Sequence, residues 1–122
     1  NVRQQNEALE QAAVELRDSY LEARRYNNVL AANKFYQGNY KKAIGLFSRA
    51  ARLAPYEEQK NDVKMNIAIT CLELAEKEKD EKKKARLCSR AQSCLNRQAP
   101  DDQLRIEYQK MCYELKSSLT AA

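Results

Sequence analysis

Residues that break helices are so scarce in this chain that they limit where its helices can end. The 122 residues include only two glycines and two prolines, and the rest is rich in Ala, Leu, Glu, Lys, Arg and Gln, which favour helices. Gly38 separates two runs of apolar residues at helical spacing, and Pro55 ends the second run. Glycine suits the C-terminus of a helix and proline cannot continue one. The sequence therefore predicts an all-α fold with a helical hairpin that turns at residues 37–39.

The length and composition are those of one soluble-type helical domain. The apolar fraction is 43%, the charged fraction is 32% and the net charge is +5. No apolar run approaches the roughly 20 residues that cross a bilayer, so we expect no membrane partner. Because the chain begins within a helical pattern and without Met, we expect it to be a domain of a longer protein.

An apolar residue recurs every seven positions along the N-terminal segment. The members of this apolar stripe are Val2, Leu9, Leu16, Ala23 and Leu30, with Ala13 and Tyr20 on the same face. The spacing is typical of a helix with a coiled-coil-like seam. We expect the seam to pack on the rest of the domain, and a homodimer through this helix is the alternative. The pattern leaves open whether the helix breaks near residues 26–28 or continues to Gln37.

The second half of the hairpin carries a recognisable order of large and small residues. The order is Gly38, Tyr40, Ala43, Phe47, Ala50 and Pro55. It resembles the second half of a tetratricopeptide repeat, a helix–turn–helix unit of about 34 residues. The resemblance implies a repeat at 24–57, a degenerate second repeat at 58–100, an N-terminal helix at 1–23 and a capping helix at 101–119. It implies antiparallel α-hairpins stacked as a short superhelix, which serves as a protein–protein interaction module.

The resemblance also implies a partner-binding groove lined by the first helix of each repeat. The residues that it places there are Arg25, Asn28, Ala32, Phe35 and Tyr36 from the first unit and Met65, Asn66, Ile69, Leu72 and Glu73 from the second. One subclass of the family, found in co-chaperones, grips chaperone carboxylates with Lys, Asn and Arg residues. Only Asn66 matches that clamp here. A divergent relative of the immunophilin-type co-chaperones that lacks the clamp is therefore an alternative within the family.

Basic residues are segregated from acidic ones along the chain. Residues 23–56 and 82–99 hold basic side chains and no acidic one, whereas residues 57–81 are rich in Asp and Glu. On the second helices of the two repeats the basic residues are Lys41, Lys42, Arg49, Arg52, Lys82, Arg86, Arg90 and Arg97. Together they could form a basic stripe for an acidic protein segment or, as the alternative function, an RNA backbone. They could equally be solvated outer faces neutralised by the acidic segment.

Motifs for catalysis are missing from this sequence. It has no His, no phosphate-binding loop and no nucleophile motif. The cysteines Cys71, Cys88, Cys94 and Cys112 form no CxxC pair, so neither a zinc site nor a disulfide framework is expected. Arg86 and Arg90 could lower the pKa of the Cys88 thiol but cannot accept its proton. We expect no enzyme activity, no cofactor and no metal, with reduced cysteines in the cytoplasm or nucleus.

Overall fold

A computed structural model describes residues 1–120 of the chain, and the side chains of residues 1–119. Five helices and no strand occupy this part, which confirms the all-α prediction. The helices are α1 (Val2–Tyr36), α2 (Tyr40–Leu53), α3 (Glu57–Lys77), α4 (Glu81–Leu95) and α5 (Gln103–Thr120). None of the helices described is both long and apolar enough to span a membrane.

The turn between α1 and α2 depends on Gly38, as predicted. Gly38 adopts a φ of 80°, in the left-handed region that side chains disfavour. The N–H of Gly38 donates to the carbonyl of Phe35, and the N–H of Asn39 donates to that of Lys34, both at 2.9 Å. These two bonds form a Schellman motif, which closes the C-terminus of α1. The Asn39 side chain then accepts from the N–H of Lys42 at 3.4 Å and caps α2.

The other helix boundaries also follow from local chemistry. Helix α2 ends at Leu53, two residues before Pro55. Residues 78–80 join α3 to α4. The carboxylate of Asp80 accepts from two N–H groups at the start of α4, and that of Asp102 does so for α5. An aspartate at this position satisfies amide groups that have no partner within the helix.

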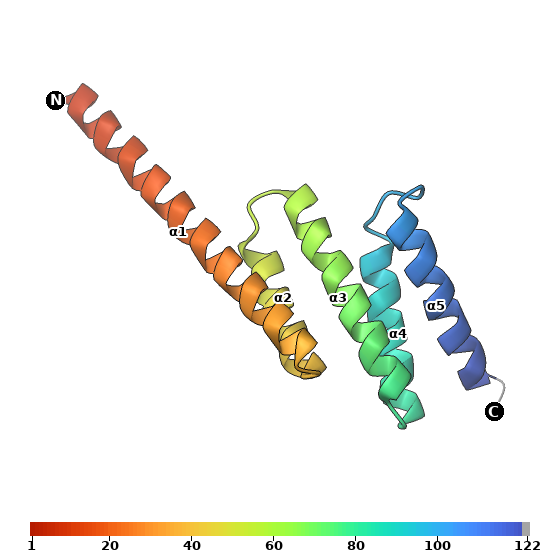
Figure 1. Cartoon of the computed structure of the whole chain (residues 1–122). Coiled ribbons are helices and arrows are strands. Elements are labelled where there is room, and N and C mark those ends of the chain that lie inside the picture. Colours follow the sequence, from red (N-terminus) through yellow and green to blue (C-terminus); the bar gives the residue numbers. More distant parts are fainter. Residues whose placement is uncertain (121–122) are drawn as a thin grey trace.

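The five helices form two layers around a core centred on α3. Helices α1, α3 and α5 run in one direction, with α2 and α4 antiparallel behind them (Figure 1). Each helix packs on the next one along the chain, and α3 also packs on α5. The core is filled mostly by small and aliphatic residues, among which Ala43, Ala68, Leu72 and Leu95 are 0% exposed. Alanines at these contacts let the helix axes approach closely.

Helix α1 is continuous over 35 residues and does not break at residues 26–28. Its N-terminal part projects beyond the other helices (Figure 1), and every residue from 2 to 20 is exposed. We call residues 2–20 the arm. The expectation that the apolar stripe packs on the domain along its whole length is therefore wrong for the arm. The reason is length: α2 has only 14 residues, too few to cover a 35-residue partner.

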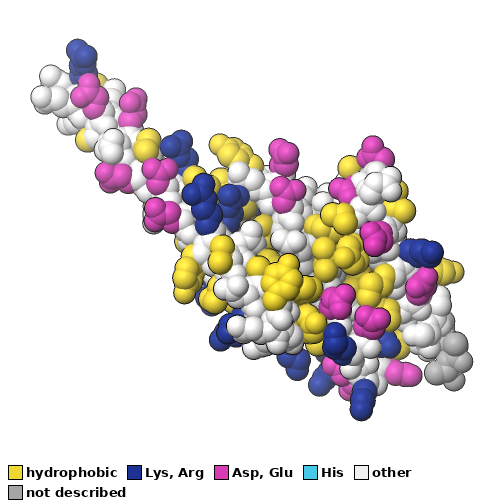
Figure 2. Space-filling model, viewed as in Figure 1, with side chains coloured by type: hydrophobic (Ala, Val, Ile, Leu, Met, Phe, Trp, Pro, Cys, Tyr) yellow, Lys and Arg dark blue, Asp and Glu magenta, His cyan; other side chains and the backbone are white. Residues whose placement is uncertain are grey.

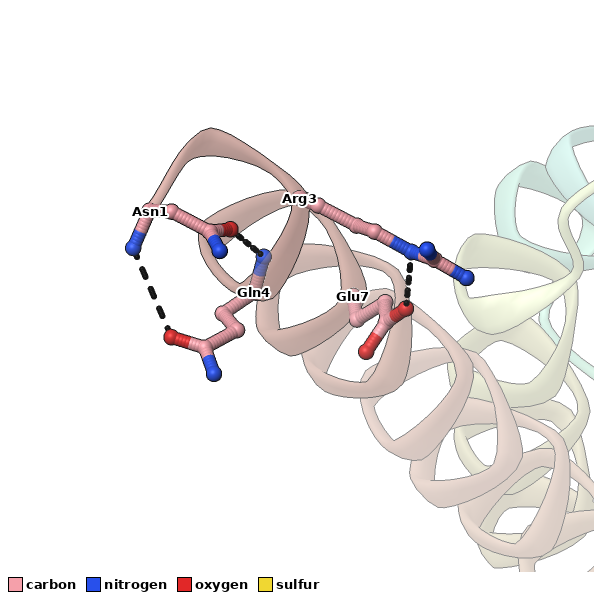
Figure 3. A network of polar contacts seen from close by, with 4 residues as sticks. All are labelled: Asn1, Arg3, Gln4 and Glu7. Atoms are coloured by element: carbon pink, nitrogen blue, oxygen red, sulfur yellow. Dashed lines mark hydrogen bonds and ion pairs between the residues drawn. The ribbon is translucent and has the colours of Figure 1, made fainter.

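The tip of the arm is closed by polar contacts of its own (Figure 3). The Asn1 side chain accepts from the N–H of Gln4 at 3.0 Å, and the Gln4 side chain accepts from the Asn1 amine at 3.4 Å. This reciprocal pair is a capping box. One turn further on, Arg3 and Glu7 form an exposed ion pair at 3.4 Å. Local capping thus supports helical structure where the rest of the domain makes no contact.

Candidate functional site

A hollow of about 490 Å³ lies between α1, α3 and α5, and we call it the groove. Figure 2 shows hydrophobic side chains gathered over this face of the molecule. The groove is lined by Asn28, Val29, Ala32, Phe35, Tyr36, Phe47, Asn66, Ile69, Thr70 and Tyr108. Their spacing on α1 and on α3 places them on one face of each helix.

The groove exists because α2 holds α1 and α3 apart. Helix α1 packs on α2 and α2 packs on α3, whereas α1 and α3 make little direct backbone contact. Phe47 of α2 lies at the bottom of the space between α1 and α3 and lines the groove. Most of the Phe47 side chain is buried in the core, because the residue is only 5% exposed. On the far side Tyr108 brings α5 into the lining. The position of the groove therefore depends on the packing order of all four helices.

The lining of the groove is uncharged among the described residues. It combines aliphatic and aromatic side chains with the amides of Asn28 and Asn66 and the hydroxyl of Thr70. The Thr70 hydroxyl donates to the carbonyl of Asn66 at 2.7 Å, which occupies its proton within α3. The Asn28 Oδ1 atom, in contrast, is buried without a hydrogen-bond partner. A buried acceptor of this kind can receive an N–H group from a ligand.

An aromatic cluster forms one end of the groove. The Phe35 ring meets the rings of Tyr36 and Tyr40 edge-on, with centroids 5.5 and 5.4 Å apart. Lys77 lies 4.8 Å from the centroid of the Tyr40 ring and donates to the Tyr40 hydroxyl at 3.3 Å. This hydrogen bond is the main cause of the raised pKa of Lys77. The cluster orients Phe35 while Tyr36, which is 85% exposed, stays on the rim.

From the described part of α5, Tyr108 alone contributes a side chain to the lining. Burial raises the pKa of its phenol, and the negative charges of Glu107 and Glu73 raise it further. Because an unperturbed tyrosine already titrates well above neutral pH, the hydroxyl carries its proton under physiological conditions. It therefore offers the groove an O–H donor opposite the amides of α1 and α3.

Six of the ten residues that the resemblance places in the groove line this hollow. They are Asn28, Ala32, Phe35, Tyr36, Asn66 and Ile69. Arg25 is exposed on α1 outside the lining, and Glu73 instead pairs with Lys77 at 3.8 Å on α3.

Met65 and Leu72, which the resemblance also places in the groove, do not line it. Met65 and Leu72 are 7% and 0% exposed and belong to the core. The physical reason is that α3 packs on α2, α4 and α5, so only a narrow face of it remains open. Sequence reasoning missed Val29, Phe47, Thr70 and Tyr108. Val29 and Thr70 lie beside predicted residues on the same helices, but nothing local marks Phe47 or Tyr108 as groove residues.

A second hollow, of about 370 Å³, gathers part of the predicted basic stripe between α2, α3 and α4; we call it the basic hollow. It is lined by Lys41, Ile44, Leu74, Glu78, Lys83, Arg86, Leu87 and Arg90. Arg90 donates to the hydroxyl of Ser48 at 2.7 Å and so links α4 to α2. Three of the eight predicted stripe residues therefore converge, together with Lys83, which the prediction did not include.

The other five predicted basic residues lie elsewhere. Arg52 lines a separate crevice beside the arm, and Lys42, Arg49, Lys82 and Arg97 are exposed outside the basic hollow. Within the described chain, ion pairs form at Arg3–Glu7, Arg17–Asp18, Lys60–Glu57 and Lys77–Glu73. No member of the predicted stripe takes part in them. The acidic segment 57–81 thus forms its pairs within α3 and leaves the cations of α2 and α4 to solvent.

The cysteine thiols are held in their neutral form. Cys71, Cys88 and Cys112 are buried and Cys94 is half-buried, and burial raises the pKa of every one, that of Cys71 to about 12. The suggestion that Arg86 and Arg90 lower the pKa of the Cys88 thiol is wrong, because burial raises that pKa and the cations that oppose the rise are Lys116 and Lys84. The Cys112 thiol donates to the carbonyl of Cys88 at 3.4 Å. These thiols act as packing groups between α3, α4 and α5.

Comparison with known proteins gives this chain no relative. No protein-family model, no curated protein and no solved structure matches it. The geometry of the groove and of the basic hollow is therefore the basis for assigning a role.

Proposed function

We propose that this domain is a non-catalytic, tetratricopeptide-like interaction module that holds an uncharged apolar segment of a partner protein in the groove. The observation that carries the proposal is the lining of the groove, which is aromatic and aliphatic with two amides and the Thr70 hydroxyl, and which has no charged side chain among residues 1–119. Apolar walls supply affinity by removing ligand surface from water, and a few polar groups fix its orientation. The unpartnered Oδ1 of Asn28 suits a backbone N–H of such a segment.

The alternation of helices supports the repeat-like part of this proposal. First helices α1, α3 and α5 supply most of the groove lining, to which α2 adds Phe47, while α2 and α4 lie behind them (Figure 1), as expected for stacked α-hairpins. Within the family, a clamp-less relative of the co-chaperones fits better than a carboxylate-binding one. A carboxylate tail would meet no Lys or Arg among the described residues that line the groove.

The non-catalytic role and the location rest on the side chains available. The chain has no His, and the raised pKa of each cysteine disfavours a thiolate nucleophile at neutral pH. Four free cysteines in the described chain suit a reducing compartment, the cytoplasm or the nucleus.

A paired substitution on α1 tests the groove. Val29→Glu with Tyr36→Gln introduces a charge and removes a ring from two exposed lining positions, 63% and 85% exposed. We expect affinity for an apolar peptide to fall by about tenfold or more, because a carboxylate in an apolar site is costly to desolvate. Fluorescence anisotropy with synthetic apolar, acidic and basic peptides of equal length measures the effect. We expect only the apolar series to bind the groove.

The matched control uses the same two replacements on the same helix. Val14→Glu with Tyr26→Gln changes exposed residues that do not line the groove, and it should leave peptide affinity unchanged. A pull-down from cell extract at high salt with nuclease extends the comparison to natural partners. Equal binding by both double variants would contradict the groove as the binding site.

The basic hollow supports a second candidate function, the binding of an RNA backbone. Its four cations Lys41, Lys83, Arg86 and Arg90 converge, and none of them forms an ion pair in the part of the chain that the structure describes. Cations with no acidic partner can neutralise phosphates, which makes the affinity fall with salt. Glu78 also lines the basic hollow, and its negative charge offsets only one of the four positive charges.

We predict that Lys83→Glu with Arg86→Glu weakens binding of a single-stranded RNA and flattens its salt dependence. Loss of two phosphate contacts should reduce the slope of log affinity against log salt by about 1.4. Lys82→Glu with Arg97→Glu changes the net charge equally but lies outside the hollow. Identical slopes for the two double variants would remove the hollow as an RNA site and leave only non-specific attraction.

A further inference from the structure

We propose that the arm is a dimerisation element, which pairs antiparallel with the arm of a second copy of this chain. This inference is independent of the groove, which lies at the other end of α1. It rests on three features of the arm: an uncovered apolar stripe, a crevice at its base and the distribution of its charges.

The stripe on the arm continues a face that is already an interface. From Ala23 onward this face of α1 packs on α2, and Asn27 and Ala31 are its buried residues. Toward the N-terminus the same face carries Leu9 and Leu16, which are 69% and 59% exposed. Its seven-residue spacing runs unchanged through both parts. A second helix that packs on α1 beyond the end of α2 would therefore bury the exposed apolar stripe of the arm.

A crevice marks the place where such a helix would enter. It has a volume of about 480 Å³ and lies between the arm and the C-terminal end of α2. Its lining is Ala13, Leu16, Arg17, Tyr20, Arg52, Leu53, Ala54 and Pro55. One wall is thus the stripe itself and the other is the end of α2. The crevice is open because α2 stops at Leu53 while α1 continues beyond it.

Charge favours the arm of a second copy as the occupant. The crevice is lined by Arg17 and Arg52 and, within the described chain, by no acidic side chain. The arm carries Glu7, Glu10, Glu15 and Asp18 against Arg3 and Arg17. Arg3 pairs with Glu7 and Arg17 pairs with Asp18 on the same helix, which leaves Glu10 and Glu15 without a cationic partner in the described chain. An acidic arm with an apolar seam therefore complements a basic crevice with an apolar wall, and both belong to the same helix.

The complementarity selects an antiparallel register. Placing Glu10 beside Arg17 of the second copy also brings Leu9 against Tyr20 and Leu16 against Ala13 of that copy. Because each contact occurs twice about a two-fold axis, the pairing closes as a dimer and leaves no free crevice.

The mass of the whole chain in solution tests the proposal directly. Sedimentation velocity over a hundredfold range of concentration should show a shift from monomer to dimer. Leu9→Glu with Leu16→Glu should leave a monomer at every concentration, with unchanged helical content because both residues are exposed. Val14→Glu with Tyr26→Glu adds the same charge to exposed residues off the stripe and should dimerise as the unmodified chain does.

A charge exchange tests the register. Glu10→Arg alone and Arg17→Glu alone should each weaken the dimer, and the two together should restore it, since every contact then again joins opposite charges. Restoration is expected only for the antiparallel pairing. An unmodified chain that stays monomeric at all concentrations would overturn the proposal, and the apolar stripe of the arm would then be a surface for a different protein. A dimer that survives both Leu substitutions, or no restoration by the double exchange, would also overturn it.

Discussion

Leu72→Ala should lower the free energy of unfolding by about 2–5 kcal/mol. Leu72 is 0% exposed in the middle of α3, and α3 packs on α2, α4 and α5. Removing its isobutyl group loses apolar burial and leaves a cavity that three neighbouring helices cannot fill without moving. Since small domains are stable by about 5–15 kcal/mol, this change consumes a large part of the total. Urea denaturation followed by circular dichroism measures it.

Leu104→Ala serves as the control for this prediction. Leu104 lies on α5 and is 48% exposed, so the same truncation there should cost less than about 1 kcal/mol. A Leu72→Ala cost as small as that of Leu104→Ala would contradict the placement of α3 at the centre of the core.

Ala43→Trp should destabilise the α1–α2 hairpin by more than the roughly 1–3 kcal/mol typical of an overpacked core. Ala43 is 0% exposed on α2, which packs on both α1 and α3. An indole ring at this site must push the helices apart, because the close approach depends on the small side chain. Hydrogen exchange should show lost protection in α2 and in residues 27–36 of α1, and thermal unfolding should shift to lower temperature.

Arg49→Trp introduces the same ring on the exposed side of the same helix. It should change stability by no more than about 0.5 kcal/mol, as is usual for surface substitutions. If Ala43→Trp and Arg49→Trp gave equal stability, Ala43 could not lie at a close helix contact.

Predictions that depend on a few neighbouring residues were confirmed. Gly38 closes the hairpin because the turn needs a residue with a left-handed φ. The hydrogen bonds of the turn join residues only three to five positions apart, so its geometry depends on local sequence. Pro55 follows the end of α2. On α1 the resemblance placed Asn28, Phe35 and Tyr36 in the groove, and residues three and four apart share a face of a helix, so these three side chains line the same hollow.

Predictions that depend on which helices pack against a given helix were often wrong. Met65 and Leu72 share helical spacing with Ile69, yet they are buried, because α3 has neighbours on three sides. The pKa of Cys88 rises because burial outweighs the charges that surround it in sequence. Whether a residue is buried depends on how the helices pack, so it cannot be predicted from the neighbouring sequence alone.

By itself the sequence determined that this protein is a set of α-helices, and it determined where α1 and α2 end. Glycine geometry, proline and side-chain caps each act within about one turn of helix, so their effects can be predicted from a few neighbouring residues. Only the tertiary structure decided which apolar faces are covered. The arm stays exposed and the groove stays open because α2 is shorter than α1 and separates it from α3. Those outcomes depend on relative helix lengths and packing order, which no single segment encodes.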